Sequence, residues 1–338
     1  MKQPRSRISS ISPSDESVEN NGKLNEGYLF VCNMILRGRK IFKNMSSSSS
    51  KLIQESNEIL PFKMNHLPDF VLKKLEEELK ETPEKKQKSL LELKKLLDAD
   101  EQLTCGIDFH EDFLTQYLRH SKYDTQRAFY HLRSMLLLRK KYSTLFDGIP
   151  DEFFLSKDSP NCIRLLSKRC PEGCTIIIYQ YAKYNPNELS VEDLKKMIVM
   201  LYFQMLRDPM TQINGFKFIH DFQGTTMQHL KLCTPSNMYL FYHAGIHCIP
   251  ARYKQFHIIN EPYWFKPCWI FIKSFLSEKV RNRVYFHSST EKLLDHFPRA
   301  ILPTEYGGDL RESYMEDWLR KANTDLKKHE VTGRPNYF

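Results

Sequence analysis

The sequence predicts an α/β protein in which an N-terminal three-helix domain precedes a domain with a mixed, mostly parallel sheet. Apolar residues recur at helical spacing up to about residue 145. Beyond that point, short β-branched and aromatic runs alternate with helical segments, which is the order of elements in an α/β layer. The hydrophobic content of 41% and the charged content of 27% are typical of globular proteins.

Residues 1–62 are predicted to be a poorly ordered leader, because Ser, Asn and charged residues dominate and Ser46–Ser50 is a homopolymeric run. The apolar stretch Tyr28–Leu36 is followed by basic residues, whereas a signal peptide carries its basic residues first. No apolar run reaches the roughly 18 residues that a membrane span needs. The 8 cysteines form no compact disulfide framework, so we expect reduced thiols and a cytoplasmic protein.

Residues 63–145 are predicted to form a helical lead domain. The first helix carries leucines at positions i, i+3 and i+7, so that they share one face. Two further helices repeat this pattern after short polar connections. The apolar positions, helix by helix, are Leu90, Leu93 and Leu97; Phe113, Leu114, Tyr117 and Leu118; and Ala128, Leu132 and Met135.

Five short segments after residue 145 have the composition of strands. They are Ile163–Ser167, Thr175–Tyr181, Gly215–Asp221, Gln255–Ile259 and Val284–Phe286. Between them, one helix begins at a capping box formed by Ser190 and Asp193. Two others begin near Thr234 and Asn260, each followed within two residues by a proline.

The formal net charge of +9 indicates an anionic partner. Zinc-finger spacing and an aromatic–basic RNA-binding signature are both missing, so nucleic acid is not the expected partner. The sequence also lacks a Walker loop, GxSxG and GxGxxG, and no pattern brings a nucleophile and a base together. We therefore expect neither an enzyme nor a bound cofactor.

Two spacings suggest metal ligands but are incomplete. His243 and His247 are four residues apart on one helix, yet no third ligand and no HExxH motif accompany them. Cys170 and Cys174 lie at a predicted turn without a second cysteine pair. We expect no metal site, and we interpret Asp221, at a strand end, as structural.

A series of motifs gives the sequence a more specific character. In order they are Asp112–Leu114, Tyr117–Arg119, Tyr123–Asp124 and Ala128–Phe129, then His257–Pro262, Phe275–Lys279, His296–Pro298 and Leu302–Gly308. Together they closely resemble the CRAL-TRIO lipid-binding family over roughly residues 85–312. The resemblance implies a lipid-binding domain at 146–312 and a C-terminal tail at 313–338. It further implies a sheet floor, a wall of helices, a deep apolar cavity and a mobile amphipathic helix, the gate, over its mouth.

The gate is assigned to Tyr263–Leu276, which is apolar nearly all round apart from Lys266 and Lys273. Such a helix is either buried in the core or in contact with a membrane. Trp264 and Trp269 close to lysines favour a membrane interface. A gate that is closed over a ligand and open on a membrane agrees with both interpretations.

Two basic pairs flank this segment. Arg252 and Lys254 are separated by one residue, and Lys279 and Arg283 are four apart on a predicted helix and so share a face. The residues alone are compatible with a solvated basic face. The resemblance implies that they bind the headgroup of phosphatidylinositol bisphosphate. The family pattern has Lys-x-Arg where this chain has Arg-x-Lys, which affects headgroup preference because only Arg binds phosphate as a planar fork.

Cavity-lining positions follow from helix and strand phase, although ordinary core positions have the same phase. They are Tyr202, Phe218, Phe241, Ala244, Ile249, Phe256, Phe265, Trp269 and Ile272. The first functional hypothesis is a monomeric carrier for a tocopherol-, retinoid- or isoprenoid-like ligand, peripheral on membranes that contain phosphatidylinositol bisphosphate. The alternatives are a phosphatidylinositol-type phospholipid exchange protein and a membrane-recruited adaptor with a vestigial cavity.

Overall fold

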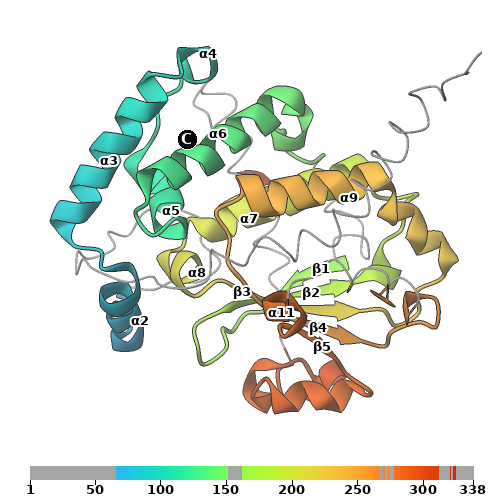
Figure 1. Ribbon diagram of the computed structural model, residues 1–338. Helices are drawn as coiled ribbons and strands as arrows, with labels where there is room; N and C mark the ends of the chain where they lie inside the picture. Colours follow the sequence, from blue (N-terminus) through green and yellow to red (C-terminus); the bar gives the residue numbers. More distant parts are fainter. Residues whose placement is uncertain are drawn as a thin grey trace, which may run out of the picture.

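The structure, a computed structural model, describes residues 66–150, 162–266, 269–270, 273, 278–311, 320 and 323–324 (Figure 1). The predicted leader at 1–62 lies outside the described residues. The same holds for most of the predicted C-terminal tail and for parts of the gate, including Ile272.

Helices fill the N-terminal part of the described chain. They are α2 (Asp69–Lys74), the π-helix η2 (Leu75–Leu79), α3 (Pro83–Asp98), α4 (Glu101–Thr104), α5 (Glu111–His120), α6 (Thr125–Lys141) and the 3-10 helix η3 (Ser143–Phe146). The three predicted helices correspond to α3, α5 and α6. The sequence analysis did not predict α2, η2 and α4, which are short and offer little periodicity.

The sheet has five strands in the order β1-β2-β3-β4-β5. Their bounds are β1 (Ile163–Leu165), β2 (Thr175–Gln180), β3 (Phe216–Asp221), β4 (Tyr253–Ile259) and β5 (Val284–Phe286). Strand β1 pairs antiparallel with β2, and the other neighbours pair in parallel. This confirms the predicted mixed, mostly parallel sheet. Strand β4 begins two residues earlier than predicted and therefore includes Lys254.

The remaining elements connect and cover the strands. They are η6 (Tyr181–Lys183), α7 (Val191–Leu206), α8 (Pro209–Asn214), η7 (Met227–Cys233), α9 (Pro235–Tyr242), the π-helix η8 (His243–Cys248), α11 (Glu278–Arg281), η9 (Thr290–Asp295), η10 (Arg299–Ile301) and η11 (Thr304–Tyr306). The predicted N-caps form: the side chains of Ser190 and Thr234 accept hydrogen bonds from the backbone N–H groups of Asp193 and Asn237. Asn260 does not begin a helix but takes a left-handed backbone with φ 54°.

Side chains along each strand alternate between two buried clusters. Ile177, Phe218 and Phe256 face the helices, where they join the cluster that includes α5, α6 and α7. Ile219 and Ile259 point to the other side and pack against Phe297 and its neighbours from η9 to η11. We call these sides the helix face and the opposite face. Figure 1 shows the helices above the sheet and the orange-red C-terminal segment below it.

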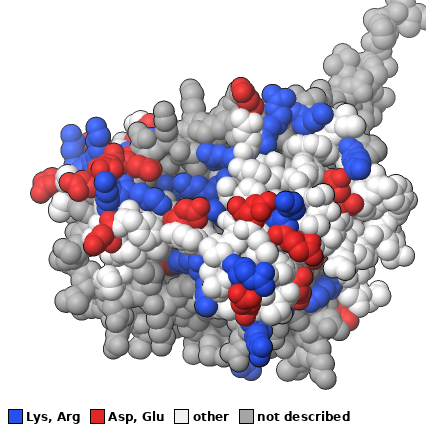
Figure 2. Space-filling view, turned by 90° about the horizontal axis from the view of Figure 1, so that it is seen from below, with Lys and Arg blue, Asp and Glu red and all other residues white. Residues whose placement is uncertain are grey.

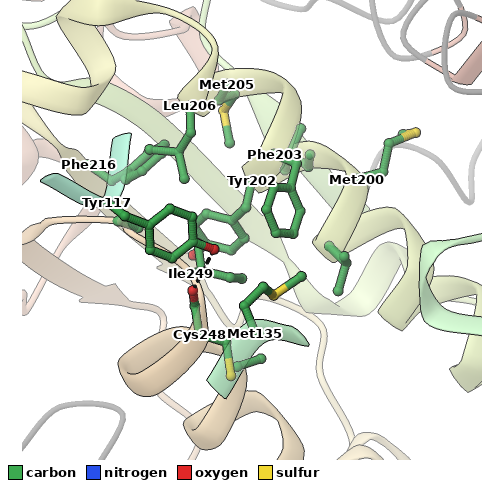
Figure 3. Packing of buried hydrophobic residues seen from close by; sticks show 14 of the residues in the cluster. Tyr117, Met135, Met200, Tyr202, Phe203, Met205, Leu206, Phe216, Cys248 and Ile249 are labelled. Atoms are coloured by element: carbon green, nitrogen blue, oxygen red, sulfur yellow. Dashed lines mark hydrogen bonds between the residues drawn. The ribbon is translucent and has the colours of Figure 1, made fainter. Parts of the chain in front are cut away.

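The N-terminal helices dock directly on the sheet-bearing part of the chain. Tyr117 from α5 is fully buried, and its hydroxyl donates a hydrogen bond of 3.0 Å to the carbonyl of Cys248 at the end of η8 (Figure 3). Around this bond, Met135 from α6 lies near Tyr202 and Phe203 from α7 (Figure 3). One continuous apolar core therefore joins the two parts.

Candidate functional site

Aromatic rings cover the helix face of the central strands. Phe218 on β3 stacks on Phe256 of β4 with ring centroids 5.2 Å apart and on Phe216 at 6.0 Å. Tyr202 of α7 meets Phe216 edge-on at 5.4 Å, and Tyr253 lies 5.7 Å from Phe218. These contacts make a continuous floor of apolar π-faces between the sheet and α7.

Six of the nine predicted cavity residues belong to, or pack against, the apolar cluster that contains this floor. Tyr202, Phe218, Ala244, Ile249 and Phe256 belong to one buried cluster, and Phe241 packs against it half-buried. Their common location agrees with strand and helix phase. That they line a cavity stays a prediction, because core residues occupy the same positions.

A polar pair lies at the C-terminal end of the floor. Nδ1 of His220, on β3, forms a 2.7 Å hydrogen bond with the Tyr181 hydroxyl. The His220 ring also stacks on the Tyr179 ring, with ring centroids 5.2 Å apart. Burial lowers the pKa of His220 to about 4, so the imidazole is neutral near pH 7. The sequence analysis missed this pair, although His220 is in phase with Phe218 along the strand. A neutral donor–acceptor pair at one end of an apolar floor is suited to orienting the polar end of a ligand.

Asp221, the residue after His220, connects two of the motifs noted in the sequence, those that contain Asn260 and Tyr306. Its carboxylate accepts hydrogen bonds from the Tyr306 hydroxyl at 2.9 Å and from the Asn260 side-chain amide at 2.8 Å. It also accepts from the backbone N–H of Gln223 at 2.9 Å. These contacts hold the turn after β4 in place, as a structural residue would.

The described gate residues have two distinct sides. Phe265 and Trp269 are half-buried, with ring centroids 4.9 Å from Phe222 and 4.8 Å from Phe286, respectively. Tyr263 and Ile270 point outward, with exposed fractions of 82% and 61%. The lysines within the gate, at positions 266 and 273, are exposed as well. Among the described residues, no helix has both the length and the apolar character for crossing a bilayer.

Three of the four predicted headgroup residues lie around Tyr253. Arg252 and Lys254 flank it in the chain, and Arg283 donates a 3.0 Å hydrogen bond to its carbonyl. Arg283 lies after α11 rather than on it, immediately before β5. Lys279 lies on α11, and its side chain is outside the described part of the structure.

Arg252 differs from a surface cation. Its side chain is 3% exposed, and its guanidinium donates to the carbonyls of Ile213 at 3.2 Å and Arg119 at 2.9 Å. Gly215 lets the backbone of Arg252 pass close to it, because a Cβ at that position would lie 2.4 Å from the Arg252 carbonyl oxygen. Burial lowers the pKa of Arg252 to about 9, and it also lowers the pKa of Lys254, which Arg252 lowers further by repulsion.

The surface below the sheet carries both signs of charge. Figure 2 views this side and shows Lys and Arg atoms interspersed with Asp and Glu. Two of the lysines that belong to this part of the chain are paired: Lys74 with Asn214 at 2.6 Å and Lys217 with Glu172 at 3.0 Å. Glu172 offsets the charge of Lys217, whereas Lys254 lies near other cations, because Arg252 and Lys74 both lower its pKa.

The two residue pairs with metal-ligand spacing, one of histidines and one of cysteines, both make other contacts in the structure. The rings of His243 and His247 are 5.5 Å apart, and the His247 carbonyl pairs with His131 Nδ1 at 3.0 Å. Cys170 and Cys174 are buried at a turn, where the Cys174 backbone N–H donates to the Cys170 sulfur at 3.3 Å. A different histidine group, described below, does bring three ring nitrogens together.

Comparison with known proteins agrees with the motif series. The CRAL/TRIO domain model matches residues 164–308. The human alpha-tocopherol transfer protein-like protein is 26% identical over 254 residues, covering 75% of this chain and 74% of that protein. Human clavesin-2 is 25% identical over 275 residues, covering 79% of this chain and 81% of that protein. A solved structure described as the crystal structure of Sfh5 aligns with a TM-score of 0.47 at 12% identity, covering 75% of this chain and 99% of that one.

The matched region begins at the second residue of β1 and ends just after η11. It contains the rest of the sheet, the aromatic floor, the gate segment and the basic residues around Tyr253. The motifs that the sequence analysis singled out from His257 onward fall inside it. Residues 164–308 of this chain match the CRAL/TRIO domain model, and the two curated relatives named above are similar to the chain over at least three quarters of its length.

Proposed function

We propose that this chain is a carrier that binds a tocopherol-, retinoid- or isoprenoid-like ligand between the sheet and its helical wall and transfers it at membranes. The observation that carries the proposal is the aromatic floor around Phe218, which offers π-faces and few polar groups to a ligand. Each buried methylene contributes about 0.8 kcal/mol, so a long apolar tail is retained with few polar contacts. The neutral pair of His220 and Tyr181 would receive the ligand's polar end.

Extraction of the purified protein with organic solvent, followed by mass spectrometry, tests this proposal. We expect one prenol-type lipid per chain, seen in native mass spectrometry as an added mass that solvent removes. Phospholipid in its place would favour the exchange-protein alternative. Protein that stays bare after incubation with lipid vesicles would contradict the carrier and favour the adaptor.

We also propose that Arg252, Lys254, Lys279 and Arg283 bind the headgroup of phosphatidylinositol bisphosphate. Support comes from the convergence of three of them around Tyr253 and from the repulsion that Lys254 experiences from Arg252. An anion at this point would relieve that repulsion. Arg252 is held by backbone carbonyls, so we assign it the role of positioning the strand end as well as supplying charge.

Reversing Lys254 and Arg283 to Glu is expected to weaken binding to vesicles containing the inositide by at least about thirtyfold. Two basic residues near an anionic surface contribute about 2 kcal/mol, and about 1.4 kcal/mol corresponds to tenfold. Vesicle sedimentation with and without inositide measures the effect, and high salt should imitate it by screening. Lys88→Glu combined with Lys95→Glu, both on the exposed side of α3, is the control matched for the change in net charge. Equal loss in the control, or no loss in the Lys254/Arg283 variant, would show that these residues are a general basic face.

A further inference from the structure

Three histidines from separate elements meet on the opposite face of the sheet. His257 lies in β4 and is fully buried, His287 follows β5, and His296 follows η9. The last two are half-buried. One ring nitrogen from each lies within 4.8 Å of the others. The residues are 30 and 9 positions apart in the sequence, which is why no ligand spacing could be recognised there.

The rings already have the closeness that a shared ion requires. His257 Nδ1 and His287 Nε2 are 2.9 Å apart, and their rings stack with centroids 5.2 Å apart. The His296 ring meets His257 edge-on at 4.7 Å and lies 5.3 Å from His287. Two nitrogens bound to the same tetrahedral Zn²⁺ at about 2.0–2.1 Å would be about 3.3 Å apart. A shift of a few tenths of an ångström therefore converts the hydrogen-bonded pair into a chelating pair.

The second ring nitrogen of His257 has the kind of partner that metal-bound histidines usually have. Its Nε2 lies 3.3 Å from the Gln255 side-chain oxygen. If Nε2–H donates to this oxygen, Nδ1 keeps its lone pair and points toward His287. A ligating histidine that donates its other N–H to an oxygen acceptor has the arrangement usual in zinc sites.

The local charge is compatible with a divalent cation. Burial, the largest cause in each case, lowers the pKa of all three histidines, so the imidazoles are neutral near pH 7, which is the form that binds metals. The groups that face the cluster are Lys217, which lowers the pKa of His257 and His296, and Asp295, which raises that of His287 and His296. The positive charge of Lys217 is offset by Glu172 at 3.0 Å.

We propose that His257, His287 and His296 bind one divalent transition-metal ion, with Zn²⁺ as the best fit. Three imidazoles suit Zn²⁺ and its neighbours, whereas Mg²⁺ and Ca²⁺ require oxygen ligands. Half-buried His287 and His296 leave a fourth position accessible to water. The ion would fasten the segment after η9 to strands β4 and β5. This site is separate from the aromatic floor, because Phe256 and His257 point to opposite faces of the sheet.

Metal binding by the full chain after chelator treatment tests this site. We expect one Zn²⁺ per chain in calorimetric titration. When Co²⁺ is bound in its place, we expect the intense visible absorption bands of tetrahedral Co²⁺. X-ray absorption at the zinc edge should show imidazole nitrogens at about 2.0 Å. His287→Gln and His296→Gln should each weaken Zn²⁺ binding at least tenfold and remove the Zn²⁺-induced rise in Tm. His110→Gln, which removes an exposed histidine on the approach to α5, should change neither.

Two results would overturn the proposal. The first is a weak visible absorption of the Co²⁺-bound, unmodified chain, as octahedral Co²⁺ gives. Zn²⁺ affinity that is unchanged in both His287→Gln and His296→Gln, with far-UV circular dichroism preserved, would show that the three rings only pack against one another. His257 is left intact in these tests because its complete burial makes it part of the core.

Discussion

Replacing Tyr263 and Ile270 by Asp is expected to slow ligand transfer between vesicles by tenfold or more, with folding and ligand content unchanged. Both side chains point outward, with exposed fractions of 82% and 61%, and exposed lysines lie on the same gate segment. Apolar side chains beside lysines suit a headgroup boundary, and each large apolar side chain that leaves water contributes about 1.5–3 kcal/mol. Fluorescence transfer assays between donor and acceptor vesicles measure the rate.

The matched control is Leu91→Asp, since Leu91 is 55% exposed on α3 and lies away from the gate. A second double variant, Phe265→Asp with Trp269→Asp, tests the inner side of the gate. Because these side chains contact Phe222 and Phe286, we expect slower transfer together with weaker ligand retention. Equal transfer rates in wild type and the Tyr263/Ile270 variant would contradict a membrane-contacting gate. Loss of folding in the inner variant would identify that side as ordinary core.

Arg119→Met is expected to lower the free energy of unfolding by about 3–5 kcal/mol, the usual cost of removing one partner from a buried ion pair. Arg119 donates to both carboxylate oxygens of Glu81 at 3.1 Å, and the Glu81 side chain is fully buried. It also donates to Gln212 of α8 at 2.7 Å, so it fastens the N-terminal helices to the α/β part. Guanidinium-induced unfolding measures the change.

The exposed pair of Lys94 and Glu111, with a 2.9 Å separation, gives the control. Lys94→Met should cost less than about 1 kcal/mol, because solvent screens that pair. Replacing both Arg119 and Glu81 by Met should recover much of the loss, since it removes the uncompensated carboxylate. Equal effects of Arg119→Met and Lys94→Met would mean that the bonds of Arg119 to Glu81 and Gln212 stabilise the fold no more than an exposed ion pair does.

Much of the fold could be predicted because local signals and burial agree. The strands stand out by their β-branched and aromatic residues, and the caps at Ser190 and Thr234 form as predicted. The start of β4 was missed because a lysine at its second position argues against a strand. In the structure that lysine falls at a register shift in the pairing of β4 with β3, between the paired residues Tyr253 and Gln255.

The candidate site was predictable to a lesser extent. Strand phase placed Phe218 and Phe256 on one face, and the structure brings them into contact. The burial of Arg252 could not be foreseen, because it depends on carbonyls of residues 119 and 213. The histidine cluster likewise depends on parallel pairing of β4 with β5 and on the return of η9 beneath them. Contacts of this kind are set by tertiary structure, which residue spacing does not encode.

The parallel pairing of β4 and β5 also limits how the molecule can rest on a bilayer. The basic residues adjoin Tyr253, at the start of β4, whereas the gate leaves from its far end and returns to Arg283. Six residue steps along this strand cover about 20 Å. If the proposed headgroup residues and the gate both contact a membrane, that membrane lies alongside β4, and the strand axis is then close to the plane of the bilayer. In that posture the gate segment would lie along the lipid surface, so a ligand released past it would enter the membrane without first crossing water.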